Sequence, residues 1–327
     1  MIRKLAGALA LTLALTLTSA ALWSPAAQAA FPERPITLIV PWAAGGGTDS
    51  VARMIASLLE KEFKVPVNVS NRTGGNGVVG HSAIATATPD GYTFGMITIE
   101  INMMHWMKLT ELTHASYTPL ALMNADPAGL QVRADSPYKT VKELVDAIKA
   151  NPGKLKASGT GIGGGWHLAL AGMLRSFDVD PKTVPWVPAT GAATALVDLA
   201  AGGLDIVPSS IPEATALIAA GRVRSLAVMA DTRNAAAPDI PTLKEASGSP
   251  WTMALWRGMV GPKGMPQEAT DKYRAALKRV YESREFQDFM RSRGFTPVWG
   301  DADAYAKFMA KDNADIGEVM TALGLRG

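Results

Sequence analysis

One segment pattern occurs once in each half of the chain and constrains the fold more than any other feature. It consists of an apolar strand, a run of three glycines and an amphipathic helix, and it spans residues 36–63 and again residues 155–177. A strand that passes through a glycine turn into a helix is typical of a parallel sheet covered by helices. The two copies therefore predict α/β structure in both halves.

Strand and helix patterns alternate along most of the chain. The segment after residue 98 is rich in Met, Trp and His and is expected to be irregular. We expect further strands at residues 67–70, 92–98, 184–187, 205–207, 223–229 and 255–260. We expect a short helix to end near residue 88, and further helices at residues 141–150, 166–177, 192–201, 212–220, 267–283, 284–293 and 302–323.

The length of 327 residues fits two lobes of ordinary size, and a single large α/β domain is the alternative. We expect lobe 1 to comprise residues 30–129 and 251–327, and lobe 2 to comprise residues 130–250. The chain then crosses between the lobes twice. Such a hinge is expected to close when a ligand binds between the lobes.

The first thirty residues have the pattern of a secretory signal peptide. Arg3 and Lys4 precede an apolar run over residues 5–22, which ends in small residues that suit a signal peptidase. We expect residues 1–29 to be removed, and an uncleaved membrane anchor is the alternative. The chain has no cysteine, which excludes disulfides, thiolate zinc sites, cysteine nucleophiles and a lipidated cysteine. The mature protein is therefore predicted to be free in the periplasm.

Charge and histidine content argue against several functions. The formal net charge is +3, and it falls to +1 without the two basic residues of the signal segment, so nothing indicates nucleic-acid binding. The four histidines, His81, His105, His114 and His167, lack the clustered spacing of metal ligands. We expect no metal and no cofactor. His167 is notable because it lies in the first turn of a helix after a glycine loop.

The two glycine loops are candidate anion-binding sites. Free backbone N–H groups point outward at a helix start, where the helix dipole is positive, and glycines let a ligand approach the backbone. Residues 41–49 contain no lysine, so they do not form a P-loop, and their spacing differs from the GxGxxG dinucleotide pattern. A carboxylate is the smaller anion that remains. The alternative is that the glycines only form tight turns.

An ordered series of short motifs covers nearly the whole mature chain. The series opens with PITLIVPWAAGGGTD at residues 35–49. Its later members are NRTGG, PDGYT, TVKEL, VP, GGLD and DIPT at residues 71–75, 89–93, 140–144, 187–188, 202–205 and 239–242. The series resembles the Bug-type receptors, the substrate-binding proteins of tripartite tricarboxylate transporters.

The resemblance implies a two-lobed periplasmic binding protein of type II, a Venus flytrap with mixed, mostly parallel sheets. It also implies a monomer that delivers a small carboxylate or amino-acid-like ligand to a two-subunit membrane permease. Carried over by position, the ligand contacts fall on Trp42, Ala44, Gly45, Gly46, Thr48 and Asp49 in lobe 1, and on Ser158, Gly159, Thr160, His167, Thr190 and Ser209 in lobe 2.

Two departures from the family pattern bear on the ligand. Thr190 stands where the family commonly has a lysine, and Glu100 follows the third strand, where small or polar residues are usual. A cation is lost and an anion is gained, which argues against a tricarboxylate. We predict a ligand with one carboxylate for the glycine loops and an amino, amide or hydroxyl donor facing Glu100, with Asp49 as a second acceptor. The alternative is that Glu100 faces solvent or pairs with a basic residue.

Two other functions compete with transport. A periplasmic sensor would bind the same ligand and pass the signal to a kinase, and its fold and pocket would be identical. A hydrolase is less favoured, because residues 80–82 only partly match a nucleophile elbow: Ile84 replaces the trailing glycine. We therefore expect a protein without catalytic residues.

Overall fold

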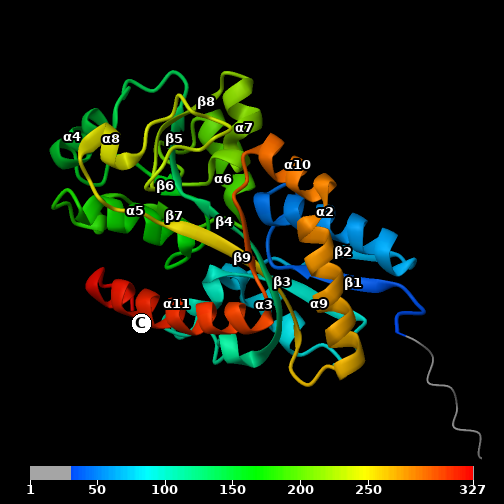
Figure 1. Cartoon of the computed structure of the whole chain (residues 1–327). Coiled ribbons are helices and arrows are strands. Elements are labelled where there is room, and N and C mark those ends of the chain that lie inside the picture. The colour runs from blue at the N-terminus through cyan, green and yellow to red at the C-terminus, as the bar shows by residue number, and fades with distance from the viewer. Residues whose placement is uncertain (1–30, 327) are drawn as a thin grey trace, which may run out of the picture.

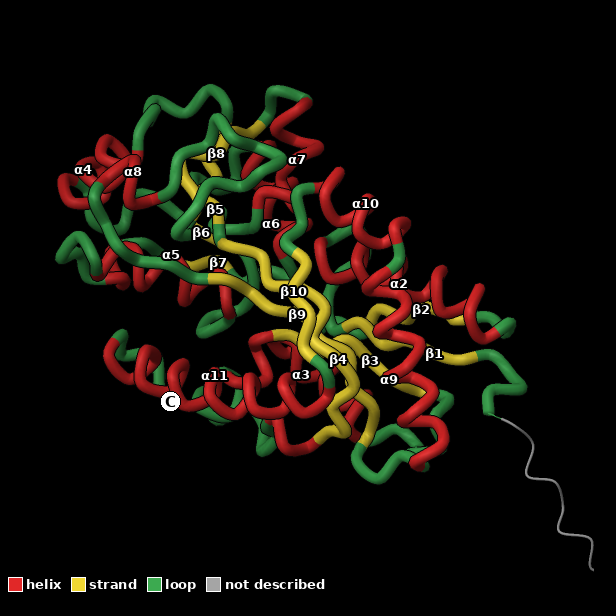
Figure 2. Tube along the Cα trace, in the orientation of Figure 1, coloured by secondary structure: helices red, strands yellow, loops and turns green. Residues whose placement is uncertain are grey.

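A six-stranded mixed sheet forms lobe 1 (Figures 1 and 2). The structure is a computed structural model that describes residues 31–326, so the predicted signal segment 1–29 lies outside the described residues. The strands are β1 (Ile36–Val40), β2 (Val67–Asn71), β3 (Thr93–Thr98), β4 (Tyr117–Pro127), β9 (Ala254–Pro262) and β10 (Pro297–Gly300). Their order is β10–β4–β9–β3–β1–β2. β1 pairs in parallel with β2 and β3, and the other pairings are antiparallel.

Helices cover both faces of this sheet (Figure 1). One face carries α2 (Gly47–Phe63), α9 (Gln267–Glu282) and α10 (Arg284–Arg293), and the other carries α3 (Val78–Ala85) and α11 (Ala302–Ala322). Successive side chains of a strand point to opposite faces, so Leu38 packs under the first group of helices and Ile39 under the second. The 3₁₀ helices are η1 (Gly75–Gly77), η2 (Ile99–Asn102) and η3 (His114–Ser116).

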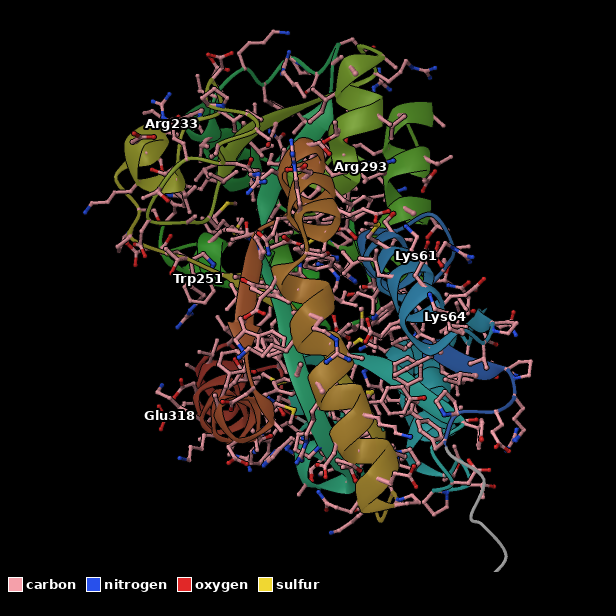
Figure 3. The ribbon with its side chains drawn as sticks, turned by 45° about the vertical axis from the view of Figure 1, so that its right-hand side comes forward. Lys61, Lys64, Arg233, Trp251, Arg293 and Glu318 are labelled. Carbon is pink, nitrogen blue, oxygen red and sulfur yellow. The ribbon has the colours of Figure 1, made fainter. Side chains whose placement is uncertain are left out.

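Helix α2 extends from the first glycine loop to the outer surface of lobe 1. Ile55 and Leu59 are buried on its inner face, as the helical spacing predicts. The helix ends where Lys64 adopts a left-handed conformation with φ 61°, and Lys61 in the last turn complements the helix dipole. Figure 3 shows both lysines on the outer surface.

Lobe 2 is built on shorter strands. They are β5 (Gly129–Arg133), β6 (Ala157–Ser158), β7 (Trp186–Val187) and β8 (Val223–Val228). β5 pairs with β8 and β6 with β7, and single bridges of Gln131 to Val207 and of Ala157 to Ile206 join the two pairs. The helices are α4 (Val141–Ala150), α5 (Gly165–Arg175), α6 (Ala192–Ala201), α7 (Ile211–Ala219) and α8 (Leu243–Ser247), with a 3₁₀ turn η4 (Pro181–Thr183).

The chain crosses between the lobes at two adjacent segments. β4 and β9 pair over their whole lengths, and lobe 2 begins directly after β4 and ends directly before β9. The backbone N–H of Ala128 donates to Met253 O at 2.9 Å and so links the two crossings. Trp251, labelled in Figure 3, fixes the return segment to α5: its indole N–H donates to Ala169 O at 3.1 Å, and its ring occupies the space beside Gly172.

Several elements differ from the sequence-based expectation. The segment expected to be irregular contains β4 and β5, and β10 and α8 were not expected. β4 lacks the alternation of a strand because Pro119 and two register shifts interrupt it and because the polar residues Asn124 and Asp126 are buried in it. In the strand expected at residues 205–207, only Ile206 and Val207 form isolated bridges. Among residues 31–326, no helix combines the length and apolar character needed to cross a bilayer.

Candidate functional site

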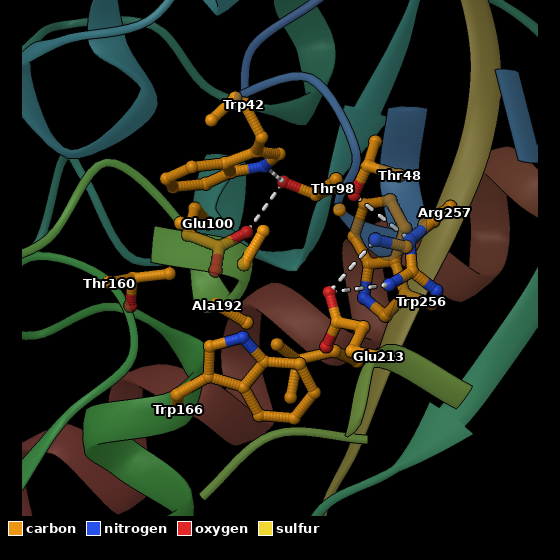
Figure 4. A pocket seen from close by; sticks show the side chains of 16 residues that line it. Trp42, Thr48, Thr98, Glu100, Thr160, Trp166, Ala192, Glu213, Trp256 and Arg257 are labelled. Carbon is orange, nitrogen blue, oxygen red and sulfur yellow. Dashed lines mark hydrogen bonds and ion pairs between the residues drawn. The ribbon is translucent and has the colours of Figure 1, made fainter. Parts of the chain in front are cut away.

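A small cavity lies between the two lobes, at the carboxyl ends of β1 and β3 (Figure 4). Its volume is about 30 Å³, room for roughly two water molecules. Hydrogen bonds of Glu213 and Glu100 to the opposite lobe hold the lobes closed on each other. Carboxyl ends of parallel strands are the usual ligand-binding edge of an α/β sheet. Lobe 1 contributes Trp42, Ala43, Gly46, Gly47, Thr48, Thr98, Glu100, Leu255, Trp256 and Arg257, and lobe 2 contributes Thr160, Trp166, Gly191, Ala192, Ala193 and Glu213.

The N-terminus of α2 forms one side of the cavity. The backbone N–H of Gly47, the first residue of this helix, donates to Glu213 Oε1 at 3.1 Å, and Glu213 belongs to α7 of lobe 2. A Cβ at Gly47 would lie 2.7 Å from Arg257 Nη2 and 3.0 Å from Glu213 Oε1. Glycine is therefore needed here because charged side chains approach the backbone closely.

Arg257 is the cation of this site. It lies on β9 and is only 3% exposed. Its Nε donates to Thr48 Oγ1 at 2.9 Å, its Nη1 pairs with Asp126, and its Nη2 lies 3.8 Å from Glu213 Oε1. Asp126 also accepts hydrogen bonds from the Asn124 side chain and from a backbone N–H of the β10 segment. The guanidinium is thus held rigidly beside the start of α2.

The N-terminus of α5 forms the opposite side. The backbone N–H of Gly165, the first residue of this helix, donates to Glu100 Oε1 at 3.2 Å. Thr98 donates its hydroxyl hydrogen to the other oxygen of Glu100 and accepts the indole N–H of Trp42 at 3.1 Å. Glu100 is 1% exposed and forms no salt bridge within residues 31–326. It therefore neither faces solvent nor pairs with a basic residue.

Each helix N-terminus thus receives a carboxylate from the opposite lobe. Glu213 of lobe 2 reaches α2, and Glu100 of lobe 1 reaches α5. Burial raises the pKa of Glu100, of Glu213 and of Asp126, and the positive charge of Arg257 opposes this rise at all three. Three carboxyl groups therefore share one guanidinium in a water-poor space.

Three indole rings complete the wall. Trp42 and Trp256 come from lobe 1 and Trp166 from lobe 2, and all three are buried (Figure 4). The indole N–H of Trp256 donates to Asp312 of α11 at 2.9 Å, which fixes this ring from behind. The Thr160 hydroxyl is buried and has no hydrogen-bond partner among the described residues. It is a polar group that a ligand could satisfy.

One side chain links the lobes at the rim of the cavity. Asn76 of η1 accepts the backbone N–H of Gly161 at 3.0 Å and donates its amide hydrogen to Ile162 O at 3.0 Å. Its backbone is left-handed, with φ 56°, a conformation that Asn tolerates better than most residues. Asn76 therefore joins the first lobe to the second glycine loop.

The structure brings five of the thirteen predicted site residues to the cavity wall: Trp42, Gly46, Thr48, Glu100 and Thr160. Ala44 and Gly45 are exposed on the loop, and Asp49 faces away from the cavity. Asp49 accepts the backbone N–H of Gly45 at 2.9 Å and pairs with Arg53 and Asn71. It stabilises the start of α2.

The remaining five predicted residues belong to lobe 2 and lie off the wall. Ser158 and Gly159 are in the strand and turn behind Thr160, and the Thr190 side chain is exposed. Ser209 donates its backbone N–H to Gln131 Oε1 at 3.0 Å. His167 Nδ1 accepts the N–H of Gly163 at 2.9 Å, and burial lowers the pKa of His167 to about 4. Its imidazole is neutral and fixes the glycine loop.

Sequence reasoning missed the charged half of the wall. In the sequence, Glu213 matches the N3 position of a capping box with Ser210. In the structure it accepts the Ser210 N–H and also reaches α2. The sequence places Arg257 in an expected strand of the C-terminal part, with no motif around it. The only available signal was a basic residue inside an apolar strand, which a fold needs to bury with partners.

Residues 80–82, which partly match a nucleophile elbow, have a structural role in the fold. His81 is fully buried within α3, its Nδ1 lies 2.8 Å from Gly77 O, and its Nε2 accepts the Thr98 N–H at 3.2 Å. Burial lowers the pKa of His81 to about 4. The imidazole therefore joins α3 to β3. Within residues 31–326, no three His, Cys, Asp or Glu side chains are grouped to hold a metal.

The chain is similar to known receptors over most of its length. The family model described as "Tripartite tricarboxylate transporter family receptor" matches residues 51–325. A UPF0065 protein of Bordetella pertussis is 31% identical, over 90% of this chain and 91% of that protein. The periplasmic binding protein BugD superposes with a TM-score of 0.85 at 28% identity, covering 90% of this chain and 99% of BugD.

A third relative has been solved with a ligand. The structure of MatC from Rhodopseudomonas palustris with bound malate matches with a TM-score of 0.81 at 25% identity, covering 88% of this chain and 99% of MatC. The sequence match, the shared fold and the cavity between two α/β lobes agree with one another. The chain therefore belongs to the Bug-type receptors of tripartite tricarboxylate transporters, a family of periplasmic solute-binding proteins and not of enzymes.

Proposed function

We propose that this protein captures a small organic carboxylate between its lobes and delivers it to a two-subunit membrane permease. The observation that carries the proposal is the cavity at which α2 and α5 both begin, with Arg257 beside α2. The malate bound to MatC supports a carboxylate as the ligand class. Receptors of this family act outside the cytoplasm, and we propose that residues 1–29 are the signal peptide that directs the chain to the periplasm.

In the proposed complex, the ligand carboxylate binds at the start of α2. Backbone N–H groups of Gly46, Gly47 and Thr48 lie at the positive end of the helix dipole. Arg257 Nη2 adds a charged donor from β9. The ligand carboxylate takes over the contacts with Gly47 and Arg257 that Glu213 makes when the lobes are closed.

The number of donors is sufficient for a useful affinity. Micromolar binding requires about 8 kcal/mol. Each hydrogen bond to a charged group contributes about 1.5–3 kcal/mol. Three backbone donors and one guanidinium donor therefore cover the requirement when the cleft excludes water.

Ligand entry requires the lobes to separate. The cavity of about 30 Å³ has room for only about two water molecules. We propose that residues 30–129 with 251–327 move as one unit and residues 130–250 as the other, with the hinge at Ala128 and Met253. Closure around the ligand then presents both lobes to the permease. Co-purification with membrane proteins separates this partner from a signalling kinase, which would use the same pocket.

The experiment that tests the proposal measures carboxylate binding by calorimetry in the parent and in Gly46→Val. A Cβ at Gly46 has only ordinary contacts, 3.5 Å from Ala43 O and 3.9 Å from Ala193 Cβ, so the fold accepts a side chain. Valine adds two methyl groups beyond this Cβ, close to Ala193 on the lobe 2 side of the cavity, and we expect them to block the ligand. We expect affinity to fall at least about tenfold, the equivalent of one lost charged hydrogen bond.

Ala310→Val, on the exposed surface of α11, is the matched control and should bind as the parent does. Equal affinity of Gly46→Val and the parent would place the ligand elsewhere and would contradict the proposal.

A further inference from the structure

The charges around the cavity are unbalanced. Glu100 and Glu213 line the wall, and Asp126 pairs with Arg257 directly behind it. Ionised, these groups carry three negative charges and one positive charge. A plain dicarboxylate would add two more negative charges to a space with little water, and unpaired buried charges are costly. The wall itself therefore disfavours a ligand that is only an anion.

The uncharged part of the wall favours a cation. Three indole rings, Trp42, Trp166 and Trp256, surround the cavity (Figure 4). An organic cation is attracted to the face of an aromatic ring, most strongly for tryptophan, and the attraction increases when water is excluded. Glu100 and Glu213 line the same cavity, and each carboxylate oxygen can accept more than one hydrogen bond.

When the ligand carboxylate replaces Glu213 at the start of α2, Glu213 loses its partners there. When the ligand carboxylate takes the contacts with Gly47 and Arg257, Glu213 retains only its capping-box contacts with Ser210. A buried carboxylate that loses a cation needs another one nearby. The ligand itself is the available source.

We propose that the ligand carries an organic cation, such as an ammonium group, which Glu100 and Glu213 hold between the tryptophan rings. This inference rests on the proposed function, in which the ligand carboxylate is held at α2. The protein is then selective for small compounds that have one carboxylate and one amine. Glu100 and Glu213 are its specificity-determining residues.

Protonated glutamates are the competing explanation, because burial raises the pKa of both groups. A protonated Glu100 would donate a hydrogen bond to a neutral or anionic ligand. The two explanations differ in their response to glutamine, which resembles a protonated glutamate in shape and in hydrogen bonding but never carries a negative charge.

The first test compares four-carbon ligands of matched shape by calorimetry at neutral pH: butyrate, succinate, γ-aminobutyrate and putrescine. The first three place a methyl, a carboxylate or an ammonium group opposite the same carboxylate. Putrescine has an ammonium group at each end and no carboxylate. We expect γ-aminobutyrate to bind at least about tenfold more tightly than butyrate and succinate, the effect of one charge-assisted contact. The same comparison at three, five and six carbons covers the unknown ligand length.

The second test repeats the series with Glu100→Gln and Glu213→Gln. Each substitution keeps the side-chain shape, and glutamine also serves in a capping box. We expect both variants to lose about tenfold or more in affinity for the amino compound and to keep or gain affinity for succinate. Glu143→Gln is the control, because Glu143 holds the same capping-box position in α4 and is exposed. It should match the parent.

The outcomes separate the two proposals. Succinate as the tightest ligand, or Glu100→Gln and Glu213→Gln with unchanged selectivity, overturns the cation inference and leaves carboxylate capture intact. Putrescine as the tightest ligand supports the cation and contradicts carboxylate capture at α2.

Thermal unfolding of each variant without ligand gives an independent check. Removing one uncompensated negative charge should raise the unfolding midpoint at neutral pH. A lower midpoint for both variants would contradict the charge imbalance.

Discussion

The two glycine loops are alike in sequence and differ in what surrounds them. Gly46 and Gly164 occupy the same N-cap position with nearly the same backbone angles, φ −78° and ψ 175° against φ −78° and ψ 173°. The first loop has Arg257 behind it and only ordinary van der Waals contacts for a side chain at Gly46. The second has no cation on the wall, and its backbone is engaged by His167 and Asn76. Similar backbone patterns thus point to different roles: we propose that the first loop binds the ligand, and the second is held to lobe 1 by the Asn76 hydrogen bonds.

The largest effect is expected where the first loop depends on its cation. Arg257→Met leaves Asp126 and Glu213 buried without their positive partner. Removing one partner of a buried pair costs about 3–5 kcal/mol, so the free energy of unfolding in urea should fall by that amount. Arg284→Met, at an arginine whose side chain is 94% exposed, should change it by less than about 0.5 kcal/mol. A loss below about 1 kcal/mol for Arg257→Met would mean that the first loop does not depend on its buried cation.

A matched pair of alanines compares the loops directly. Both Gly46→Ala and Gly164→Ala carry the same N-cap penalty. A Cβ at Gly164 would lie 2.4 Å from Thr160 Oγ1 and 2.9 Å from Asn76 Oδ1, whereas at Gly46 the contacts are ordinary. We expect Gly164→Ala to lose about 1–3 kcal/mol more in free energy of unfolding than Gly46→Ala. Equal losses would mean that the second loop is no more tightly packed than the first.

Much of this comparison was open to prediction from the sequence. Both strand–glycine–helix segments form as expected, and helical periodicity located α2, α4, α5 and α9 to within a few residues. Local patterns of this kind depend on neighbours in sequence. The family resemblance extended them to two lobes with a ligand site between.

The charged partners could not be predicted, because they meet only in the folded chain. Glu213 and Gly47 are 166 residues apart, and Arg257 and Thr48 are 209 apart. Glu100 was singled out as an unusual acid near the pocket, but its hydrogen bond to Gly165 depends on how the lobes close. Asn76 gave no signal, since its role comes from a contact across the cleft.

A smaller effect tests the closing role of the second loop. Asn76→Gly keeps the left-handed backbone and removes both cross-lobe hydrogen bonds. Two neutral hydrogen bonds contribute about 1–3 kcal/mol, so the unliganded protein should open and its radius of gyration in X-ray scattering should increase. Lys64→Gly, at another left-handed residue in lobe 1 on the outer surface, should leave the scattering unchanged. Identical curves for both variants would count against the Asn76 contact as a closing element.

The smallest effect concerns pH. Burial raises the pKa of Glu100 above its usual value of 4.5, so the folded state holds this proton more tightly than the unfolded state does. The resulting stability is complete below pH 4.5 and is lost as pH rises through the folded-state pKa. The melting temperature of Glu100→Gln minus that of the parent should therefore increase between about pH 5 and pH 8, by about 2 °C or more. A difference that is flat or falls with pH would contradict the raised pKa.

Native mass spectrometry of freshly purified protein tests most directly whether the α2 loop with Arg257 holds a carboxylate between the lobes. A ligand held in a closed cleft can survive purification. We predict a bound species whose accurate mass and fragmentation identify one carboxyl group and one amine, and which is missing from Gly46→Val prepared in the same way. A retained compound without a carboxyl group, or one that persists in Gly46→Val, would contradict the account.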